Sequence, residues 1–570
     1  PRTGPDETGA SLAHGESRPR AAIGGEVWGE ARKRRFSGRG GLPIPLKILL
    51  RRNGNHMKRL APLTVLCAAA FAALPALAVP GPDSVAVLAN LAEPASVALM
   101  QTYADARHIP AGQRCAVDVP AYDDLPVADF GPKIVEPLLA CLAKSGALPR
   151  IEAVVLMRGM PRRLHLLGQP GTLRVSLAAA LAVARSVRTA DGVHVVGLAP
   201  GLEVNGGGAW RATWSNPYTK GPFRAGFEDT VGAFTHRMWL VTALDGFTFA
   251  DAAKLVGSAL AAEPFDLSSQ WLLMKGADKA RAALDGQLPG VAAQLGDLLP
   301  VGVSVEAFQG NLSGRHLGAF VTGSANLGET IEGNTWAPGA LVDNLTSFGA
   351  RPENFVAPEE GGKAVQVAIA RWVRAGVAGV HGTVSEPLNN CFPARQFLVD
   401  YASGATLAEA YWRNLPYVYW MNLVLGDPMV APFARRPTLN LSALTPATMN
   451  QSQVNVEAEQ VAHMRVTASA DGDPLGLLRI FVDDALVWDA DGATGEVVLD
   501  SGSHEIVAVA QAAPSDSGAG VWQSKGWRAW TVDVVGVAAA DVSQSDDVDN
   551  PYGSGGADGD GAKAQTGGCD

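Results

Sequence analysis

One histidine, one cysteine and one glutamate lie close together in the central part of the chain. His381 and Cys391 are separated by a short segment that contains Glu386. A thiolate, an imidazole base and an acidic group that orients the imidazole form the arrangement used by cysteine hydrolases. If the segment folds back on itself, these three side chains could form such a group. The alternative is that His381 caps a strand end and Cys391 is a small buried residue, as cysteine often is.

The elements around these residues are predicted by apolar patterns. The run Val377–Val380 predicts a core strand that delivers His381 and Glu386 into the following loop, where α/β sheets usually place their ligands. An apolar stripe with helical spacing predicts a helix before that strand, and Gly376 is expected to end it. The stripe consists of Val365, Ala368, Ile369, Trp372 and Val373.

Two further helices are predicted after Cys391. Pro393 can open the first of them and Gly404 can close it. Thr406 and Glu409 have the spacing of a capping box for the second, because hydroxyl and carboxylate can each satisfy a free backbone donor.

The rest of the first 430 residues alternates strand and helix patterns, which predicts an α/β fold with a mostly parallel sheet covered on both faces. Residues 323–350 are predicted to form a loop, a helix and a polar strand end, whereas residues 263–316 give no clear pattern. The predicted strands cover residues 84–88, 151–157, 193–198 and 317–322, and the predicted helices cover residues 94–107, 131–142, 173–187 and 248–261.

Composition limits the size and the partners of the protein. A chain of 570 residues with 47% hydrophobic and 18% charged residues is expected to form two or three domains. The formal net charge of -10 argues against nucleic acid as the main partner.

The beginning of the chain predicts export. Residues 1–56 lack helical or strand periodicity, and we interpret them as a disordered leader or upstream translation before Met57. Residues 57–78 combine a basic start, an apolar stretch and a small-x-small cleavage site, as in a signal peptide. The apolar stretch is too short for a membrane anchor, so we expect no transmembrane helix in the mature chain. The predicted location is extracellular, periplasmic or at the cell surface.

The character of the sequence changes after residue 436. Residues 437–537 contain short alternating apolar and polar runs separated by turns, which predicts an immunoglobulin-like β-sandwich, often a spacer or adhesive module in exported proteins. Residues 538–570 form an acidic, Gly-rich stretch with too few apolar residues to fold. This tail resembles the spacer before a C-terminal sorting signal. We expect either a truncated end, with contact to sorting machinery through the tail, or an ordinary acidic tail.

The cysteines and the known metal-binding motifs indicate no further functional site. Cys115 and Cys141 lie in the same predicted lobe and could form a disulfide, or both could be thiols. The sequence contains no CxxC or HExxH motif and no Gly-rich phosphate loop after a strand. We therefore expect neither a metal nor a cofactor.

Seven ordered motifs carry a family resemblance. Together they resemble an uncharacterised family of secreted bacterial proteins associated with exosortase-type sorting systems, over about 350 residues. The motifs are RHIPAGQRC (107–115), VLMRGMP (155–161), NPY (216–218), MWLVTALDG (238–246), WAPGALVDNLTSFG (336–349), AGVHGTVSEP (378–387) and LVLGDPMVAPF (423–433).

A second resemblance bears on mechanism. The order of strands and motifs in residues 79–436 is similar to the caspase-like fold of gingipain-type cysteine peptidases, and it implies a two-lobed core. In those enzymes a histidine follows the third core strand and the nucleophilic cysteine follows the fourth. The corresponding positions here fall near Gly323–Ser324 and near Ser347, so neither required residue is present. A Ser347 nucleophile would need a base, for which His316, Glu329 and Glu332 are the nearby candidates.

These patterns predict an exported cell-envelope or surface protein of bacterial type. Its expected role is non-catalytic: binding or scaffolding through a degenerate caspase-like site around Ser347, His381, Glu386 and Cys391, with a protein or polysaccharide of the cell surface as partner. The alternative is a secreted hydrolase, of peptidase type, that uses Ser347 or Cys391 as nucleophile and His381 as base.

Overall fold

The computed structural model describes most of the chain between residues 80 and 537. All described residues fall within the compact unit Ala72–Asp570. The predicted leader, signal peptide, strand 193–198 and acidic tail lie outside them. Among the described helices, none is both long and apolar enough to cross a membrane. The described ranges are 80–120, 124–165, 174–185, 187–188, 214–216, 218–219, 228–231, 234–387, 389–445, 447–457, 461–471, 474–513 and 524–537.

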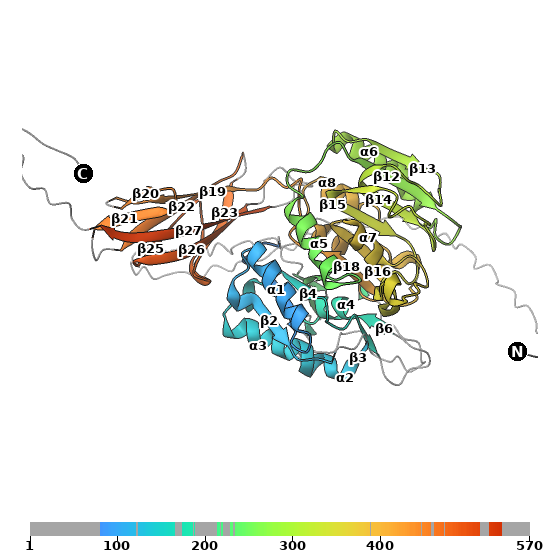
Figure 1. Ribbon diagram of the computed structural model, residues 1–570, viewed down its shortest axis with the longest axis horizontal. Coiled ribbons are helices and arrows are strands. Elements are labelled where there is room, and N and C mark those ends of the chain that lie inside the picture. Colours follow the sequence, from blue (N-terminus) through green and yellow to red (C-terminus); the bar gives the residue numbers. More distant parts are fainter. Residues whose placement is uncertain are drawn as a thin grey trace, which may run out of the picture. The chain divides into compact units, whose positions relative to one another are not determined.

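A ten-stranded sheet lies at the centre of residues 80–430 (Figure 1). Pairing is parallel from β13 to β16 and from β11 to β2, whereas β18 runs antiparallel to β16. The prediction of an α/β fold with a mostly parallel sheet is confirmed. In sheet order the strands are β13 (Val303–Glu306), β12 (Gln270–Gly276), β14 (His316–Gly323), β15 (Thr335–Asn344), β16 (Gly379–Thr383), β18 (Asn422–Gly426), β11 (Leu240–Leu244), β4 (Ala153–Met157), β1 (Val85–Asn90) and β2 (Arg114–Val117).

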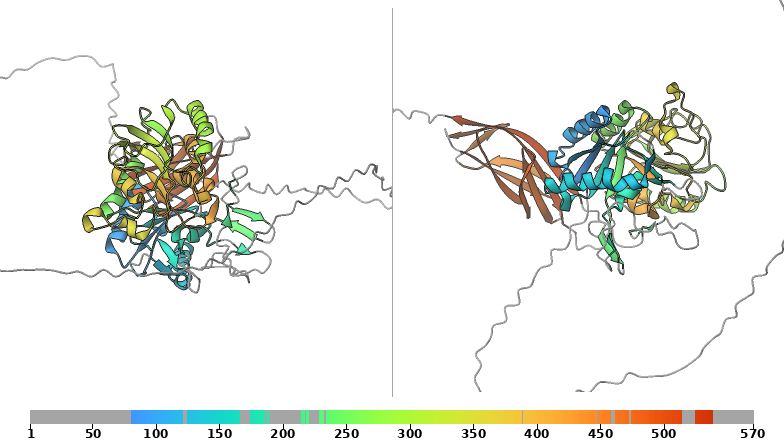
Figure 2. Two further views of the ribbon diagram at one scale, coloured as in Figure 1. Left: turned by 90° about the vertical axis from the view of Figure 1, so that its right-hand side faces the viewer. Right: turned by 90° about the horizontal axis from the view of Figure 1, so that it is seen from below.

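Helices pack along this sheet (Figures 1 and 2). Contacts join α1, α5 and α7 in one row and α6, α8 and α9 in another. Several central strands are buried along their whole length because helices and neighbouring strands enclose them, which explains their continuous apolar sequences. The helices are α1 (Pro94–Ala106), α2 (Val127–Phe130), α3 (Glu136–Lys144), α4 (Leu177–Ala182), α5 (Phe249–Leu260), α6 (Leu288–Leu298), α7 (Ile369–Ala375), α8 (Phe397–Ala402) and α9 (Leu407–Asn414).

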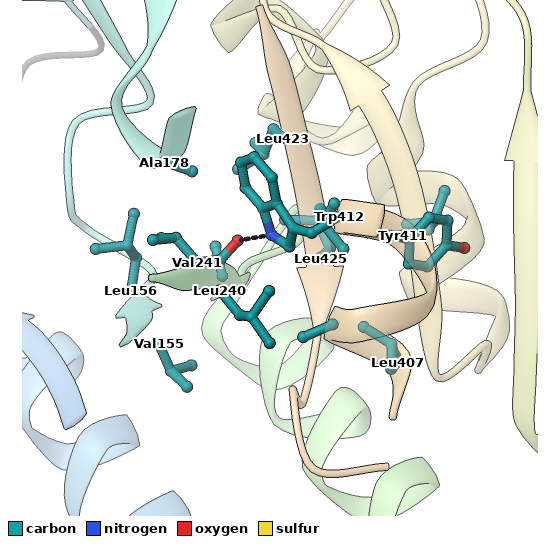
Figure 3. Packing of buried hydrophobic residues seen from close by; sticks show 14 of the residues in the cluster. Val155, Leu156, Ala178, Leu240, Val241, Leu407, Tyr411, Trp412, Leu423 and Leu425 are labelled. Carbon is teal, nitrogen blue, oxygen red and sulfur yellow. Dashed lines mark hydrogen bonds between the residues drawn. The ribbon is translucent and has the colours of Figure 1, made fainter. Parts of the chain in front are cut away.

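Aromatic side chains of α9 fasten this helix to the sheet (Figure 3). Trp412 is fully buried, and its indole Nε1 donates a hydrogen bond to the Val241 carbonyl of β11 at 2.9 Å. The Tyr411 hydroxyl donates to the Val342 carbonyl of β15 at 2.8 Å. Each ring therefore fills the core while its polar atom reaches a backbone acceptor, which is what a buried Trp or Tyr requires.

The central stretch differs in detail from its prediction. The strand covers Gly379–Thr383, so His381 lies inside it and not in the following loop. The preceding helix begins only at Ile369, whose backbone N–H is held by the Gly349 carbonyl at 2.8 Å. Val365 is 54% exposed and belongs to the loop, where its N–H is bonded to Asn354 at 3.1 Å. These loop bonds compete with the helical pattern and shorten the helix.

Other predicted elements also differ from those in the structure. The predicted helix within residues 323–350 is wrong, because these residues contain the ten-residue strand β15. Pro338 and Gly339 mask its strand pattern, and they lie where the register with β14 shifts. The unassigned residues 263–316 form β12, α6 and β13. The helix expected over residues 131–142 is split into a π-helical turn, Gly131–Val135, and α3, and α4 covers only the middle of residues 173–187.

Two further sheets follow residue 437. One has the order β19-β22-β25 and the other the order β20-β21-β27-β26-β23-β24, and apolar residues of both form one hydrophobic cluster. Their pairings are antiparallel apart from β21–β27. The predicted short strands are thus present. They are β19 (Thr438–Ala443), β20 (Thr448–Asn450), β21 (Gln453–Glu457), β22 (Ala462–Ser469), β23 (Leu475–Val482), β24 (Ala485–Asp491), β25 (Thr494–Leu499), β26 (Gly502–Ala512) and β27 (Lys525–Val537).

Cys115 and Cys141 form a disulfide, which settles the choice that the sequence left open. The bond joins β2 to α3, at the edge of the large sheet. Closing a loop of this length restricts the unfolded chain.

We predict that the double substitution Cys115→Ala and Cys141→Ala lowers the free energy of unfolding by about 3.5 kcal/mol, the loop-closure value for a sequence separation of 26. Denaturant unfolding of the variant and the wild type measures this difference. Wild-type protein unfolded under reducing conditions should match the variant. Equal stability of the variant and the oxidised wild type would contradict the bond.

The capping box predicted at the start of α9 is confirmed. Thr406 Oγ1 accepts a hydrogen bond from the Glu409 N–H at 3.3 Å, and Glu409 Oε2 accepts one from the Thr406 N–H at 2.8 Å. Glu409 is buried, and desolvation raises the pKa of its carboxyl from 4.5 to about 8, against the opposing effect of the Thr406 hydrogen bonds. The carboxyl is therefore protonated in the folded protein at mildly acidic pH.

Glu409 should make stability depend on pH. The folded state binds this proton more tightly than the unfolded state, so the contribution is complete below about pH 4.5 and is lost as pH rises towards 8. Glu409→Gln keeps the capping box and removes the titration. We expect the fall in melting temperature between pH 5 and pH 8 to be smaller in Glu409→Gln than in the wild type. Glu496→Gln, at the exposed end of a surface ion pair, is the control and should follow the wild type.

Candidate functional site

Ser347 and Glu386 meet where β15 and β16 end. The Ser347 hydroxyl donates a hydrogen bond to Glu386 Oε1 at 2.9 Å, and the Thr383 hydroxyl donates to the Ser347 carbonyl at 2.7 Å. Glu386 is exposed and Ser347 is half-buried. Neighbouring parallel strands end at the same edge of a sheet, which explains why two residues so far apart in sequence lie together.

Gln366 holds the loop that contains Ser347 by hydrogen bonds. Gln366 Oε1 accepts a hydrogen bond from the Ser347 N–H at 3.0 Å and another from the Thr346 hydroxyl. Both the backbone and the hydroxyl of Ser347 thus have defined partners. The arrangement presents a hydroxyl and a carboxylate to solvent in a fixed orientation.

His381 is held inside the sheet. Its ring is fully buried, with Nδ1 2.8 Å from Asp343 Oδ1 and Nε2 3.0 Å from Asn422 Oδ1. Asp343 stands opposite it on β15, and Asn422 belongs to β18. Nδ1 donates to the carboxylate, and Nε2 is bonded to the amide whichever way that amide is turned. Neither ring nitrogen faces the Ser347–Glu386 pair.

An arginine completes this buried group. Arg395 is 2% exposed; its Nη1 is bonded to Asp343 Oδ2, and its Nη2 donates to the Thr322 carbonyl at 3.0 Å. Burial alone would raise the pKa of the Asp343 carboxyl, but Arg395 and His381 together hold it below its usual value. The carboxylate is therefore charged and links three strands of the sheet, β14, β15 and β16.

Cys391 lies at the end of a short 3₁₀ turn, Asn389–Cys391, and its side chain is fully buried. It is not part of the disulfide. The four predicted site residues thus divide into a pair at the surface, half-buried Ser347 with exposed Glu386, and two buried residues, His381 and Cys391. The structure does not gather them into one group that is open to solvent.

The other candidate bases for Ser347, which are His316, Glu329 and Glu332, lie at or before the starts of β14 and β15, whereas Ser347 follows the end of β15. His316 begins β14 and is bonded to Asp266 at 2.8 Å and to Thr335 at 2.9 Å. Since β14 and β15 are parallel, the length of a strand, roughly 20 Å, separates this end from the Ser347 end. Glu332 precedes β15 and pairs with Arg371, and Glu329 comes three residues earlier still.

Arg158 and Arg162, which were not predicted as site residues, lie on the segment after β4. Arg158 Nη1 and Arg162 Nε each lie 2.7 Å from a carboxylate oxygen of Asp245, which follows β11. Burial alone would raise the pKa of the Asp245 carboxyl, but the two arginines hold it below its usual value. Polar residues directly after two apolar strands, in VLMRGMP and LVTALDG, were the available sequence signal.

The same segment reaches the Ser347 side of the sheet. Arg163 forms two hydrogen bonds with Asp124, and its Nη1 donates to the Val384 carbonyl at 3.2 Å, two residues before Glu386. The Arg162 guanidinium lies over the Phe355 ring at 4.0 Å. The segment after β4 therefore contacts Asp245 after β11, Phe355 after β15 and the backbone after β16, and residues beyond strand ends commonly bind ligands in α/β sheets. Among the described residues, no group of three or more His, Cys, Asp or Glu side chains is arranged to hold a metal ion.

We predict that Asp343→Ala strongly destabilises the protein. The substitution leaves Arg395 and His381 buried without their shared carboxylate, and loss of one partner of a buried ion pair typically costs about 3–5 kcal/mol. Denaturant unfolding measures the change. Asp278→Ala, which breaks an exposed pair with Arg281, should have little effect. Similar stabilities for the two variants would show that the buried network is not a structural requirement.

Comparisons with known proteins identify no family. No protein-family model and no curated protein matches the chain. Solved structures give weak similarities, among them fibronectin(III)-like modules of Clostridium thermocellum CbhA, with 15% identity over 20% of this chain and 52% of that chain and a TM-score of 0.13. A β-glucosidase from Listeria innocua in complex with glucose has 8% identity over 51% of this chain and 50% of that chain, with a TM-score of 0.14. These matches span about half of each solved chain, and scores this low do not establish a shared fold.

Proposed function

We propose that this chain is an exported cell-envelope or surface protein with a non-catalytic role in binding or scaffolding. In this proposal residues 79–436 form a degenerate caspase-like core and residues 437–537 an immunoglobulin-like module. The partner is a protein or polysaccharide of the cell surface. The binding site is the sheet edge that carries Ser347 and Glu386.

The observation that carries this proposal is the position of His381. A general base must come within about 3 Å of the hydroxyl proton, directly or through one water. The ring of His381 is buried, and both its nitrogens are bonded to Asp343 and Asn422. The Ser347 hydroxyl is bonded to Glu386 instead. A Ser347–His381 or Cys391–His381 hydrolase would require this network to be broken.

Export has independent support. The signal-peptide pattern of residues 57–78 predicts secretion, and the Cys115–Cys141 disulfide favours an oxidising compartment. A fixed, exposed hydroxyl and carboxylate beside arginines suits recognition of a polar ligand, since such groups orient a partner by hydrogen bonds.

The test combines activity and binding measurements on the purified full chain. We expect neither a fluorophosphonate probe nor a thiol-reactive peptide probe to label Ser347 or Cys391, and no cleavage of a peptide library. Glu386→Lys should weaken binding to an isolated envelope polysaccharide or protein fraction by about tenfold, because it removes the acceptor of Ser347 and reverses the local charge.

Glu360→Lys, another exposed position, is the matched control and should bind as the wild type does. Probe labelling and peptide cleavage that both disappear in Ser347→Ala would replace the binding proposal by the hydrolase. Unchanged binding of Glu386→Lys to both fractions would remove this edge of the sheet as the binding site. Comparison of the two fractions distinguishes a polysaccharide from a protein partner.

A further inference from the structure

Lys525, the first residue of β27, is buried against two carboxylates from the other end of the chain. Its Nζ lies 3.3 Å from both Oδ1 and Oδ2 of Asp83 and 3.0 Å from Glu152 Oε2. It also donates a hydrogen bond to the Ser84 hydroxyl at 2.9 Å. Asp83 and Glu152 lie just before β1 and β4, the adjacent parallel strands of the large sheet.

Lys525 and Asp83 are closed to solvent, and Glu152 is partly exposed. The side chains of Lys525 and Asp83 are 1% and 0% exposed, and that of Glu152 is 18% exposed. Gly81 leaves the space that the lysine occupies: a Cβ there would lie 2.8 Å from Lys525 Cδ and 2.9 Å from Asp83 Oδ1. The amine and the carboxyl are thus packed in direct contact.

The position of Nζ is close to that needed for attack on the carboxyl carbon. Because Nζ is equally far from the two oxygens of Asp83, its distance from Cγ is roughly 3–4 Å, near the range in which reacting atoms are held before a bond forms. Arg479 Nη1 is bonded to Oδ2, whereas Oδ1 has no hydrogen-bond partner among the described residues. The two oxygens therefore differ: Arg479 binds Oδ2 in addition to Lys525, whereas Oδ1 has only the Lys525 ammonium beside it and is the oxygen that leaves.

We propose that Lys525 and Asp83 condense into an intramolecular amide, with Glu152 as the group that relays protons. The Nζ–Cγ bond forms and the Cγ–Oδ1 bond breaks. Of the three protons of the ammonium group, one stays on the amide nitrogen and two leave with Oδ1 as water. The charges of ammonium and carboxylate cancel in the product, so no oxidant, reductant or further reactant is needed.

Neighbouring groups have defined roles in this step. Arg479 stabilises the negative charge that develops on Oδ2 when nitrogen adds to the carbon. Burial raises the pKa of the Glu152 carboxyl above its usual value, against the attraction of Lys525, which suits a group that accepts and returns a proton. Lys525 and Arg479 hold the pKa of Asp83 below its usual value although burial opposes them, so the reaction has to draw both protons from the ammonium through Glu152.

The bond would have a mechanical consequence. Asp83 is near the start of the described chain, and Lys525 lies in the last described strand before the tail. An amide between them would close a covalent loop around nearly all of the described residues. A pulling force applied outside the loop would then act through the cross-link and would not unfold the sheets inside it.

The test is mass spectrometry of the full-length wild-type protein after reduction, denaturation and proteolysis. We expect one peptide that contains both Asp83 and Lys525, lighter by one water molecule than the sum of its parts, with fragment ions that locate the bond. Recovery of the two peptides only as separate, unmodified species from folded protein would overturn the proposal and leave an ordinary buried ion pair.

Variants distinguish formation of the amide from proton relay by Glu152. Lys525→Arg keeps the charge and cannot form the amide, whereas Asp83→Asn should give the same linked peptide with loss of ammonia instead of water. Glu152→Gln keeps both reacting groups, and we expect it to reduce the linked fraction at least tenfold. An unchanged linked fraction in Glu152→Gln would exclude Glu152 as the relay. Lys133→Arg, in a partly exposed pair with Asp129, is the control and should be linked as the wild type is.

Discussion

The antiparallel pairing of β16 with β18 is the constraint on which the rest of the sheet depends. At this place Asp343 of β15, His381 of β16 and Asn422 of β18 form one buried chain of hydrogen bonds, and Arg395 extends it to the end of β14. Uncompensated burial of any one of these charges would cost several kcal/mol, so the network is stable only when all four elements are in register. That register in turn places the loops after β15 and β16 side by side and brings Ser347 to Glu386.

The same network decides how the candidate site should be interpreted. A catalytic imidazole needs one nitrogen to be oriented and the other to face the substrate. His381 satisfies the first requirement through Asp343, but its second nitrogen is bonded to Asn422. The acidic residue that orients a base in a hydrolase here forms a structural ion pair with Arg395. These contacts favour rigidity at the sheet edge, which benefits binding by fixing the exposed hydroxyl and carboxylate in advance.

Signals confined to one helical turn predicted the local structure correctly, whereas features that depend on long-range partners could not be predicted. The capping box of Thr406 and Glu409 was predictable because both members lie within one helical turn. β15 was missed because Pro338 and Gly339 weaken its strand pattern, and only pairing with β14 reveals it. Ser347 became a candidate only through the family resemblance, and its bond to Glu386 depends on two strands being neighbours. Arg158, Arg162 and Asp245 were visible as polar residues after strands, but nothing in the sequence showed that they bind one another.

The contacts of the C-terminal sheets argue against their being a mere spacer. A spacer needs few specific contacts with the preceding core, yet Lys525 and Arg479 bury their charges against Asp83, and Trp527 lies beside the guanidinium groups of Arg107 and Arg436. Buried ionic contacts of this kind contribute less to stability than apolar packing but strongly penalise any wrong arrangement. The C-terminal sheets therefore behave as a specifically docked part of the same folded unit, and this docking brings an amine from the end of the described chain against a carboxyl from its beginning.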